Sequence, residues 1–418
     1  MSLADDLRGI NLPAVGEFNL SVILSLVRMS PQGISRTELA HRTGLAHQTV
    51  SNAVGYLIKA GLIAEADLVT RGRGRPRMML RLRSDARFAV GAYFDPTSSA
   101  FFVLNLAGEV KAHRSAPTIG AERPERLVAN LATAIGDVIA ASGVDPSLIL
   151  GVGLATPGPV DLERGSLHFP SLLPTWGDEP LREPLAAATG LPVTMNMDVN
   201  AAAAGEVWVS AEPARNFALV IYGAGIGTGL VLGGEPFLGR SGNAGFGGTI
   251  IVPSAGAPPV RRSESLGHLV TPRYLLKQAE SEGFSVPGRD TVTRFAALVG
   301  ACRAGAPAAK TVLERAGRLL GDAMVTLTNV LDLDEIVFAG PSWDEVRDIF
   351  LPLVAEQLHT SEYRMTPGDY PKLRDATVGV DVAAFGAACT VLDSSFARLA
   401  GGRSPDPQTS SAPRGPRT

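Results

Sequence analysis

The sequence predicts an α/β protein in two parts, a small basic head and a larger body that repeats one arrangement of strands and helices. Its 418 residues exceed the size at which a single hydrophobic core stops growing. Residues 1–80 carry nine Lys and Arg against six Asp and Glu, whereas the whole chain has a net charge of -3. Near Phe88 the apolar pattern changes from helical spacing to strand-like runs between helices. A basic head on an acidic body favours a polyanionic partner for the head.

Three helices are predicted in the head. Apolar positions at helical spacing predict the first over residues 18–30. Ser35 and Glu38 have the spacing of a capping box, which predicts a second helix ending near Thr43. After a glycine turn, a third helix over residues 46–60 ends at another glycine.

The third helix is predicted to have one apolar face and one polar face. Its apolar positions are Val50, Val54, Leu57 and Ile58, and its polar positions are His47, Gln48, Ser51, Asn52 and Lys59. Gln and Asn can pair with adenine through two hydrogen bonds, and Ser, Thr and His reach bases or phosphates. The pattern is typical of a helix-turn-helix whose second helix enters the major groove. A small helical bundle with a polar solvent face is the alternative.

An arginine-rich loop favours DNA over that alternative. Two extended stretches, residues 62–65 and 78–82, flank a run in which four arginines alternate with glycine and proline. An arm of this kind follows phosphates or enters a narrow minor groove. A solvated hairpin would mix charges of both signs.

The body is predicted to contain a βββ-α-β arrangement twice. The first copy comprises strands at 88–94, 100–106 and 109–113, a helix at 124–142 and a strand at 148–155. The second comprises strands at 217–222 and 229–232, a helix at 309–330, a strand at 335–339 and a terminal helix at 382–398. The Pro- and Ser-rich residues 401–418 are predicted to be a disordered tail.

Composition excludes several classes of protein. No apolar run approaches the roughly 18 residues of a membrane span, and the N-terminus lacks the pattern of a secretion signal. We therefore expect a cytoplasmic protein without a membrane partner. Cys302 and Cys389 are the only cysteines, which excludes a disulfide framework and a four-cysteine zinc site.

The run from Asn19 to Leu82 resembles the winged helix-turn-helix of the ROK family, whose members include sugar-responsive repressors and sugar kinases. The resemblance rests on ISRTELAHRTGLAHQTVSNAVGYLIKAGLI followed by RGRGRP, and it is to regulators of the xylose-repressor and N-acetylglucosamine-repressor type. Gly151 to Asp161 resembles the family's GIGIxxPGPVD segment, and residues 176–193 resemble the stretch leading to its sugar site. The implied fold of the body is a duplicated actin-like ATPase (ribonuclease H-like) domain.

The resemblance implies four segments and a set of DNA contacts. The segments are a winged helix-turn-helix domain (1–82) with its wing at 71–77, ROK subdomain 1 (83–210), ROK subdomain 2 (211–400) and the tail (401–418). The expected DNA-binding residues are Ser35, Arg36, Thr37, His47, Gln48, Thr49, Ser51, Asn52, Arg71, Arg73, Arg75 and Arg77. Ala46 stands where many such recognition helices have a capping Ser. We therefore expect the helix start to use the His47 or Gln48 side chain, or a DNA phosphate.

The phosphate-binding features of the kinases are only partly kept. Tyr93-Phe94-Asp95-Pro96-Thr97 stands where the family has an Asp-x-Gly-x-Thr turn. This places a negative charge where phosphates would arrive and removes one amide donor, so we expect no nucleotide in that turn. The glycine loop at 223–229 is kept and is either a phosphate cradle or a tight hairpin.

The sugar and zinc sites are also altered. Asp198 matches the family's catalytic base, but Met197, Leu172, Phe246 and Thr249 replace its Asn, Asn, Glu and His. Three of these four changes exchange a hydrogen-bonding group for an apolar one, and each unpaired group on a buried sugar costs roughly 1–3 kcal/mol. The effector candidates are Asn196, Asp198, Asn200, Phe246 and Thr249. With Thr249 at the histidine position and no cysteine in 260–270, we expect no zinc, and His268 to be a packing or surface residue.

The sequence thus predicts a sequence-specific DNA-binding transcriptional regulator, a repressor in the first instance, with no catalytic residue, cofactor or metal. The expected partners are double-stranded operator DNA, a small-molecule effector such as a sugar or other metabolite, and further copies of the chain in a homodimer or dimer of dimers. Two alternatives stay open. A sugar kinase with an N-terminal DNA-binding extension would need the intact phosphate turn, the Asn-Asp pair and usually zinc. A DNA-bound scaffold would use its body only for dimerisation.

Overall fold

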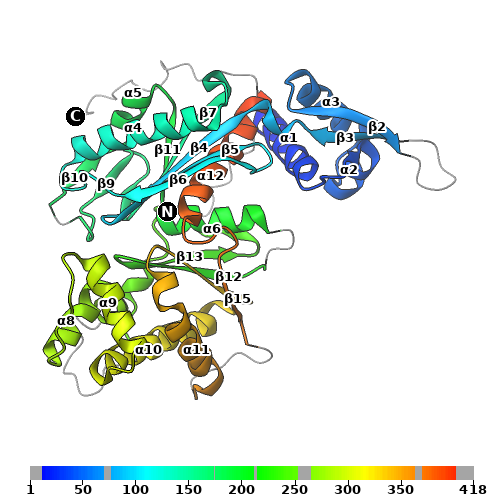
Figure 1. Ribbon diagram of the computed structural model, residues 1–418. Helices are drawn as coiled ribbons and strands as arrows, with labels where there is room; N and C mark the ends of the chain where they lie inside the picture. Colours follow the sequence, from blue (N-terminus) through cyan, green and yellow to red (C-terminus); the bar gives the residue numbers. More distant parts are fainter. Residues whose placement is uncertain are drawn as a thin grey trace, which may run out of the picture. The chain divides into compact units, whose positions relative to one another are not determined.

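The computed structural model describes residues 12–69, 77–173, 175–210, 214–252, 265–362 and 370–401. Contacts divide the chain into two compact units. One comprises the residues up to Phe88, Asn105–Ala107 and the chain from Leu392, and the other comprises Ala89–Leu104 and Gly108–Val391. The first unit contains the head and the second contains most of the body (Figure 1).

The head is a winged helix-turn-helix. Three helices, α1 (Leu12–Arg28), α2 (Arg36–Thr43) and α3 (His47–Lys59), accompany an antiparallel sheet of order β1-β3-β2 (Figure 1). The strands are β1 (Ile34–Ser35), β2 (Ile63–Val69) and β3 (Arg77–Leu82). The three predicted helices are confirmed, although α1 begins earlier than expected and ends at Arg28. Both wing strands are longer than the extended stretches that the sequence predicts.

Local signals explain how the head's helices begin and end. The Ser35 hydroxyl accepts a hydrogen bond from the Glu38 amide at 3.2 Å, which is the Ser35 half of the predicted capping box. Gly44 ends α2 with a φ of 70°, a left-handed conformation that glycine adopts without strain. One face of α3 buries Val50, Ala53, Val54 and Leu57, whereas Ile58 is half-buried. The buried face of α3 therefore differs from the expected one by Ala53.

The body contains two five-stranded sheets, of order β11-β7-β4-β5-β6 and β14-β13-β12-β15-β16 (Figure 1). The first is formed by β4 (Phe88–Phe94), β5 (Ser98–Asn105), β6 (Val110–Pro117), β7 (Ile149–Thr156) and β11 (Val193–Met197). The second is formed by β12 (Phe217–Tyr222), β13 (Ile226–Leu232), β14 (Glu235–Pro236), β15 (Glu335–Ala339) and β16 (Lys372–Asp375). Helices α4 (Pro124–Ser142) and α10 (Pro307–Leu331) complete the two copies of the predicted βββ-α-β arrangement.

Several elements escape the sequence prediction. They are the strands β1, β11, β14 and β16, a small sheet of β8 (Val160–Asp161), β9 (Ser166–His168) and β10 (Asp178–Pro180), and the helices α5 (Arg182–Thr189), α6 (Asp198–Val209), α7 (Leu266–Val270), α8 (Pro272–Ser281), α9 (Thr291–Arg303) and α11 (Trp343–Thr360). The terminal helix α12 (Val382–Gly401) is close to its predicted position. None of the described helices is long and apolar enough to cross a membrane.

The start of α12 lies unusually close to the first sheet. A Cβ atom on Gly91 or Gly153 would overlap the backbone of Ala384 and Ala387, respectively. Only glycine leaves room for this approach. The second glycine of the family-like Gly151 to Asp161 segment is thus required for packing.

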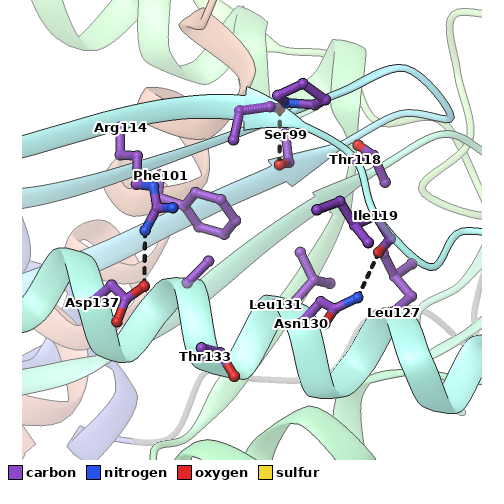
Figure 2. A pocket seen from close by; sticks show the side chains of 13 residues that line it. Ser99, Phe101, Arg114, Thr118, Ile119, Leu127, Asn130, Leu131, Thr133 and Asp137 are labelled. Atoms are coloured by element: carbon purple, nitrogen blue, oxygen red, sulfur yellow. Dashed lines mark hydrogen bonds and ion pairs between the residues drawn. The ribbon is translucent and has the colours of Figure 1, made fainter.

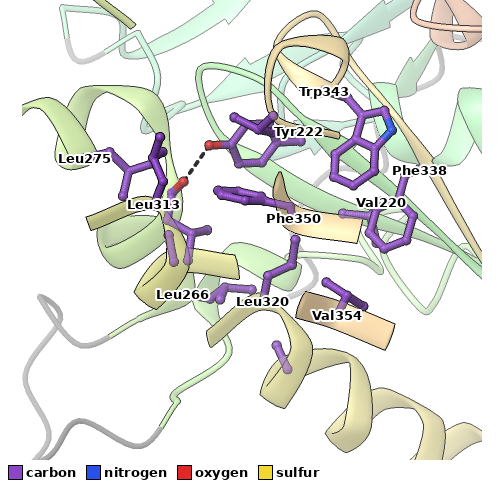
Figure 3. Packing of buried hydrophobic residues seen from close by; sticks show 14 of the residues in the cluster. Val220, Tyr222, Leu266, Leu275, Leu313, Leu320, Phe338, Trp343, Phe350 and Val354 are labelled. Carbon is purple, nitrogen blue, oxygen red and sulfur yellow. Dashed lines mark hydrogen bonds between the residues drawn. The ribbon is translucent and has the colours of Figure 1, made fainter. Parts of the chain in front are cut away.

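Aromatic side chains between α10, α11 and the second sheet form the core of that half of the body (Figure 3). Phe338 and Trp343 stack with ring centroids 4.4 Å apart, and Phe350 meets Tyr222 edge to face at 5.6 Å. The Tyr222 hydroxyl donates to the Val270 carbonyl at 2.7 Å. Burying one such side chain stabilises a fold by roughly 1.5–3 kcal/mol, so this cluster anchors α10 and α11 on the sheet.

Candidate nucleic-acid interface and effector site

Helix α3 exposes a continuous polar face. His47, Gln48, Ser51 and Asn52 are exposed and Thr49 is half-buried. Gln48 and Asn52 lie opposite the buried Val50 and Val54, whereas His47 is exposed because it is the first residue of the helix. Successive residues of an α-helix are rotated by about 100°, so the residues two positions before and after Val50, which are Gln48 and Asn52, point away from the buried face. The helix therefore presents amide, hydroxyl and imidazole groups where a major groove could receive them.

Two of these residues act as a pair. Gln48 Nε2 donates to Asn52 Oδ1 at 2.9 Å, one helical turn along the exposed face. The bond holds both amides in one orientation and leaves the Gln48 oxygen and the Asn52 amide nitrogen directed to other partners. Each side chain thus has lower entropy to lose when it meets a base edge.

The N-terminus of α3 has no side-chain cap within the described part of the chain. Ala46 is the N-cap residue. The expectation that His47 or Gln48 would cap it is therefore wrong, since Gln48 binds Asn52. The first amides of a helix are unsatisfied and carry a partial positive charge, so this end suits a phosphate.

The three candidates near α2 differ in availability. Ser35 is 4% exposed and its hydroxyl caps α2, so it supports the helix-turn-helix from inside. Arg36 forms a 2.8 Å ion pair with Glu65 of β2, and both side chains stay partly exposed. Thr37 is exposed in the first turn of α2. Ser35 thus supports the fold, whereas Thr37 is exposed and Arg36 is partly exposed.

Strands β2 and β3 flank the arginine-rich run in the sequence. Strands β2 and β3 pair as far as Val69 and Arg77. Arg71, Arg73 and Arg75 lie outside the described residues, and Arg77 is the first residue of β3.

In the body, the Asp95 carboxylate forms hydrogen bonds within its own turn. Its Oδ1 accepts hydrogen bonds from the Thr97 amide and hydroxyl, both at 2.6 Å, and from the Ser98 amide at 2.7 Å. Its Oδ2 accepts from the Tyr93 hydroxyl at 3.3 Å. Burial, with smaller contributions from Asp95 and Asp198, raises the pKa of Tyr93 well above its usual value. The carboxylate thus closes the β4–β5 turn, and Tyr93 and Thr97 are partners that the sequence does not reveal.

The glycine loop is a tight hairpin. Strands β12 and β13 pair from Phe217↔Val231 to Tyr222↔Ile226, and the Gly223 amide donates to the Gly225 carbonyl at 2.9 Å. Asp95 Oδ2 lies 3.5 Å from the position of a Cβ on Gly223. A phosphate at this loop would meet a carboxylate at close range.

Apolar side chains approach Gly158 and Gly225, the region that the resemblance assigns to the sugar site. Phe246 and Met197 both approach Gly158, at 3.0 Å and 2.6 Å from the position of a Cβ there. Leu172 approaches Gly225 in the same way, at 3.3 Å. Met197, Phe246 and Leu172 therefore lie against glycines in this part of the body and present apolar contact surface there.

Asp198 is the acid that remains in this region. It begins α6, is half-buried, and its Oδ1 accepts from the Val199 amide at 2.8 Å. Burial, and then the neighbouring Asp95, raise the pKa of Asp198 to about 7. Near neutral pH the carboxyl can thus hold or release a proton.

The other effector candidates are largely occupied. Asn196 donates to the Thr390 hydroxyl of α12 at 3.2 Å, and Thr249 donates to the Phe246 carbonyl at 2.7 Å. Asn200 is buried and donates to the Gly242 carbonyl at 2.9 Å, while its Oδ1 accepts no bond from the described residues. The structure thus brings Met197 and Phe246 together but directs Asn196 toward α12.

No group of three or more His, Cys, Asp and Glu side chains within the described ranges could hold a metal ion. His268 bonds the Ser265 hydroxyl through Nδ1 at 2.7 Å and meets the Tyr274 ring at 4.5 Å, as expected of a packing residue. Neither Cys302 nor Cys389 forms a disulfide. Residues 253–264 lie outside the described part of the chain.

Comparison with family models gives two matches. Residues 96–394 match the ROK family model, and residues 20–74 match a MarR family model. The second match includes α2 and α3. The two matches separate the chain into the same head and body that the fold shows.

Individual relatives include both transcriptional regulators and a kinase. The chain is 25% identical to the DNA-binding transcriptional dual regulator NagC of Escherichia coli, over 87% of this chain and 90% of that protein. It is 27% identical to a glucokinase of Halalkalibacterium halodurans, over 72% of this chain and 93% of that enzyme. A match to the putative xylose repressor of a Caldicellulosiruptor species, at 29% identity, spans 59% of that protein.

A solved structure supports the fold across head and body. The ROK family transcriptional regulator described as a homolog of E. coli MLC superposes with a TM-score of 0.74 and 20% identity. The match covers 93% of this chain and 99% of that chain. The two chains therefore share the combination of winged helix-turn-helix and duplicated body.

Proposed function

Because the chain belongs to the ROK family, we propose that it is a DNA-binding transcriptional regulator whose kinase-like body has lost phosphoryl transfer. One observation carries the proposal. The exposed face of α3 offers Gln48, Ser51 and Asn52 to an external partner, in the helix that a winged helix-turn-helix places in the major groove.

DNA reading would divide into base contacts and phosphate contacts. The Gln48–Asn52 pair would contact base edges, with adenine preferred, because both amides offer a donor and an acceptor. The open start of α3, Thr37 and the arginines at 71, 73 and 75 would contact phosphates or the minor groove. The first group would set sequence preference and the second would set most of the salt dependence.

Loss of phosphoryl transfer is proposed from Asp95 and the apolar contacts. A nucleotide phosphate at the glycine loop would face the Asp95 carboxylate, and no described side chain offers it a compensating charge in that turn. Met197, Leu172 and Phe246 supply none of the hydrogen bonds that a sugar needs on burial. Asp198 alone, without these partners, would have no oriented hydroxyl to deprotonate.

An effector would then differ from a common hexose. We expect it to place an apolar surface against Met197 and Phe246 and hydrogen-bond donors toward the Asp198 carboxyl and the Asn200 Oδ1. It would control transcription by preferring the arrangement of two heads that does not fit the operator. This requires a homodimer or a dimer of dimers, in the cytoplasm where the operator lies.

A genome-wide binding map, followed by assays on purified protein, tests the proposal. The map should return one motif with two related half-sites, separated by about 34–36 Å or a multiple of it. The purified chain should bind that motif, and should form no sugar phosphate from ATP and common hexoses and carry no stoichiometric zinc. A map without a motif would contradict DNA reading, and a sugar phosphate would favour the kinase alternative.

A further inference from the structure

Beyond Asn52, one position on the exposed face of α3 carries no side chain. Gly55 lies three residues after Asn52 and four before Lys59, and all three residues are exposed. Residues three or four positions apart lie on the same side of an α-helix. The exposed face therefore has a gap between the side chains of Asn52 and Lys59, in line with the Gln48–Asn52 pair.

Nothing in the described part of the chain requires glycine at this position. The φ of Gly55 is not in the left-handed region, and a Cβ built on it would meet no described atom within 4 Å. Gly91 and Gly153 differ, because the backbone of α12 lies against them. A glycine inside a helix lowers the equilibrium constant for folding about four- to fivefold relative to alanine. The fold alone would thus favour alanine at position 55.

An approach from outside the chain accounts for the missing side chain. Glycine lets another molecule contact the helix backbone, which a Cβ would prevent. In a winged helix-turn-helix, the molecule at this face of the helix is DNA in its major groove. The Gln48–Asn52 pair favours adenine, and an A·T pair carries the C5-methyl group of its thymine in that same groove. The bare surface at Gly55 has the space and the apolar character that such a methyl group needs.

We infer that Gly55 is a specificity-determining residue whose missing side chain leaves room for a thymine methyl group of the operator. The inference rests on the proposed reading of DNA by α3. Gln48 and Asn52 recognise the adenine edge by hydrogen bonds, and Gly55 recognises the thymine methyl by close contact. Shape and hydrogen bonding thus act together on one face of the helix.

Gly136 of α4 provides a matched control. It is exposed inside a helix, and a Cβ built on it would meet no described atom within 4 Å. Helix α4 belongs to the second unit, where the neighbouring Asp137 pairs with Arg114 of β6 at 2.8 Å (Figure 2). Gly136→Ala therefore removes the same helix penalty as Gly55→Ala and leaves the exposed face of α3 unchanged.

The inference is tested with full-length wild type, Gly55→Ala and Gly136→Ala on synthetic duplexes that carry the motif returned by the binding map. Fluorescence anisotropy measures the Kd. Gly55→Ala should weaken binding by about tenfold or more, because its added methyl group overlaps the base edge. Gly136→Ala should bind as wild type does. Circular dichroism melting curves should show both variants to be at least as stable as wild type.

Uracil in place of each thymine of the duplex, one at a time, removes only the methyl group. At one position wild type should lose about fourfold in affinity, the effect of one buried methyl group. At that same position Gly55→Ala should bind the uracil duplex more tightly than the thymine duplex. This reversal of preference assigns the thymine methyl group to Gly55.

Equal affinity of Gly55→Ala and wild type would overturn the inference, and so would a loss of affinity that uracil relieves at no position. A Gly55→Ala variant less stable than wild type would also overturn it, because the fold itself would then require glycine. If wild type recognises no motif, the proposed function fails and the inference fails with it. If wild type and Gly55→Ala recognise the motif equally well, the inference fails alone.

Discussion

Polar groups on the exposed face of α3 and those around Asp95 and Asn196 in the body differ in what they bond to. On α3, Gln48 and Asn52 bond only each other and keep further donors and acceptors for an external partner. In the body, Asp95 and Asn196 are bound to the chain's own turn and to α12. Recognition needs polar groups that folding has left available. The Gln48–Asn52 pair is therefore available to a partner, whereas Asp95 and Asn196 support the body's own structure.

The largest effect should come from breaking a bond network inside the body. Glu206 is fully buried and accepts from Arg374 at 2.5 Å and from the Thr377 amide and hydroxyl at 3.0 Å and 2.6 Å. Glu206→Ala removes the acceptor of both Thr377 bonds and leaves Glu335 as the ion-pair partner of Arg374, so it should lower the free energy of unfolding by about 3 kcal/mol. Urea denaturation measures the free energy of unfolding. Glu356→Ala, which removes an exposed carboxylate, is the control. Equal stability of the two variants would contradict the supporting role of the body's polar groups.

A comparable change in the head, Gln48→Ala, should affect binding to the operator and not the stability of the fold. Gln48→Ala should weaken operator binding by about 1–3 kcal/mol. Its free energy of unfolding should stay within about 0.5 kcal/mol of wild type, because the side chain is exposed. Fluorescence anisotropy and urea denaturation measure the two quantities, and Gln32→Ala removes an exposed amide outside α3 as a control. If Gln48→Ala loses stability but keeps its affinity for the operator, Gln48 supports the fold and does not read DNA.

Asp198 should make stability depend on pH. Its pKa is raised to about 7 by burial and by Asp95, whereas an unfolded Asp ionises near 4. The neutral form is favoured by folding, so wild type should lose stability relative to Asp198→Asn as pH rises from about 4 to 7. We expect a loss of about 2 kcal/mol, allowing for solvent at the half-buried side chain.

A control with the opposite sign is available at Asp145. The Ser147 amide and hydroxyl hold the pKa of this exposed carboxyl below its usual value. Asp145→Asn should therefore be less stable than wild type above pH 4, with the difference disappearing in acid. Denaturation at several pH values measures both variants. Parallel pH profiles for wild type and Asp198→Asn would show that burial does not perturb Asp198.

The smallest effect concerns the arginine-rich wing. Changing Arg73 and Arg75 to Ala should reduce the slope of log affinity against log salt by about 1.8, if each contacts one phosphate. The ranking of operator sequences should stay the same, because phosphate contacts carry no base information. Titrations at several salt concentrations give the slope. An unchanged slope would exclude both arginines from the interface.

The head could be predicted from sequence because its signals are local. Periodicity predicts α1 and α3, and Ser35 and Gly44 mark the ends of α2. Helix α6 was missed for the opposite reason. It is buried on almost all sides, including Ala201, Ala202 and Ala203, so its apolar residues show no helical period.

The chemistry of the body was predicted only in part. A changed residue type is visible in the sequence, so the apolar character of Leu172, Met197 and Phe246 could be recognised, and the loss of sugar contacts there stays a prediction. Partners that are distant along the chain are not visible. The bond from Asn196 to Thr390 joins residues 194 positions apart, and the mutual bond of Gln48 and Asn52 depends on side-chain orientation. Both determine which polar groups remain available.

The most direct test of α3 as the reading element replaces each operator base in turn and measures affinity for wild type and Asn52→Ala. Wild type should discriminate against the wrong base by about 1–3 kcal/mol at each directly read position. Asn52→Ala should bind all four bases with equal affinity at one such position and keep the wild-type preference at the others. An unchanged base preference at every position would contradict reading of the operator by α3.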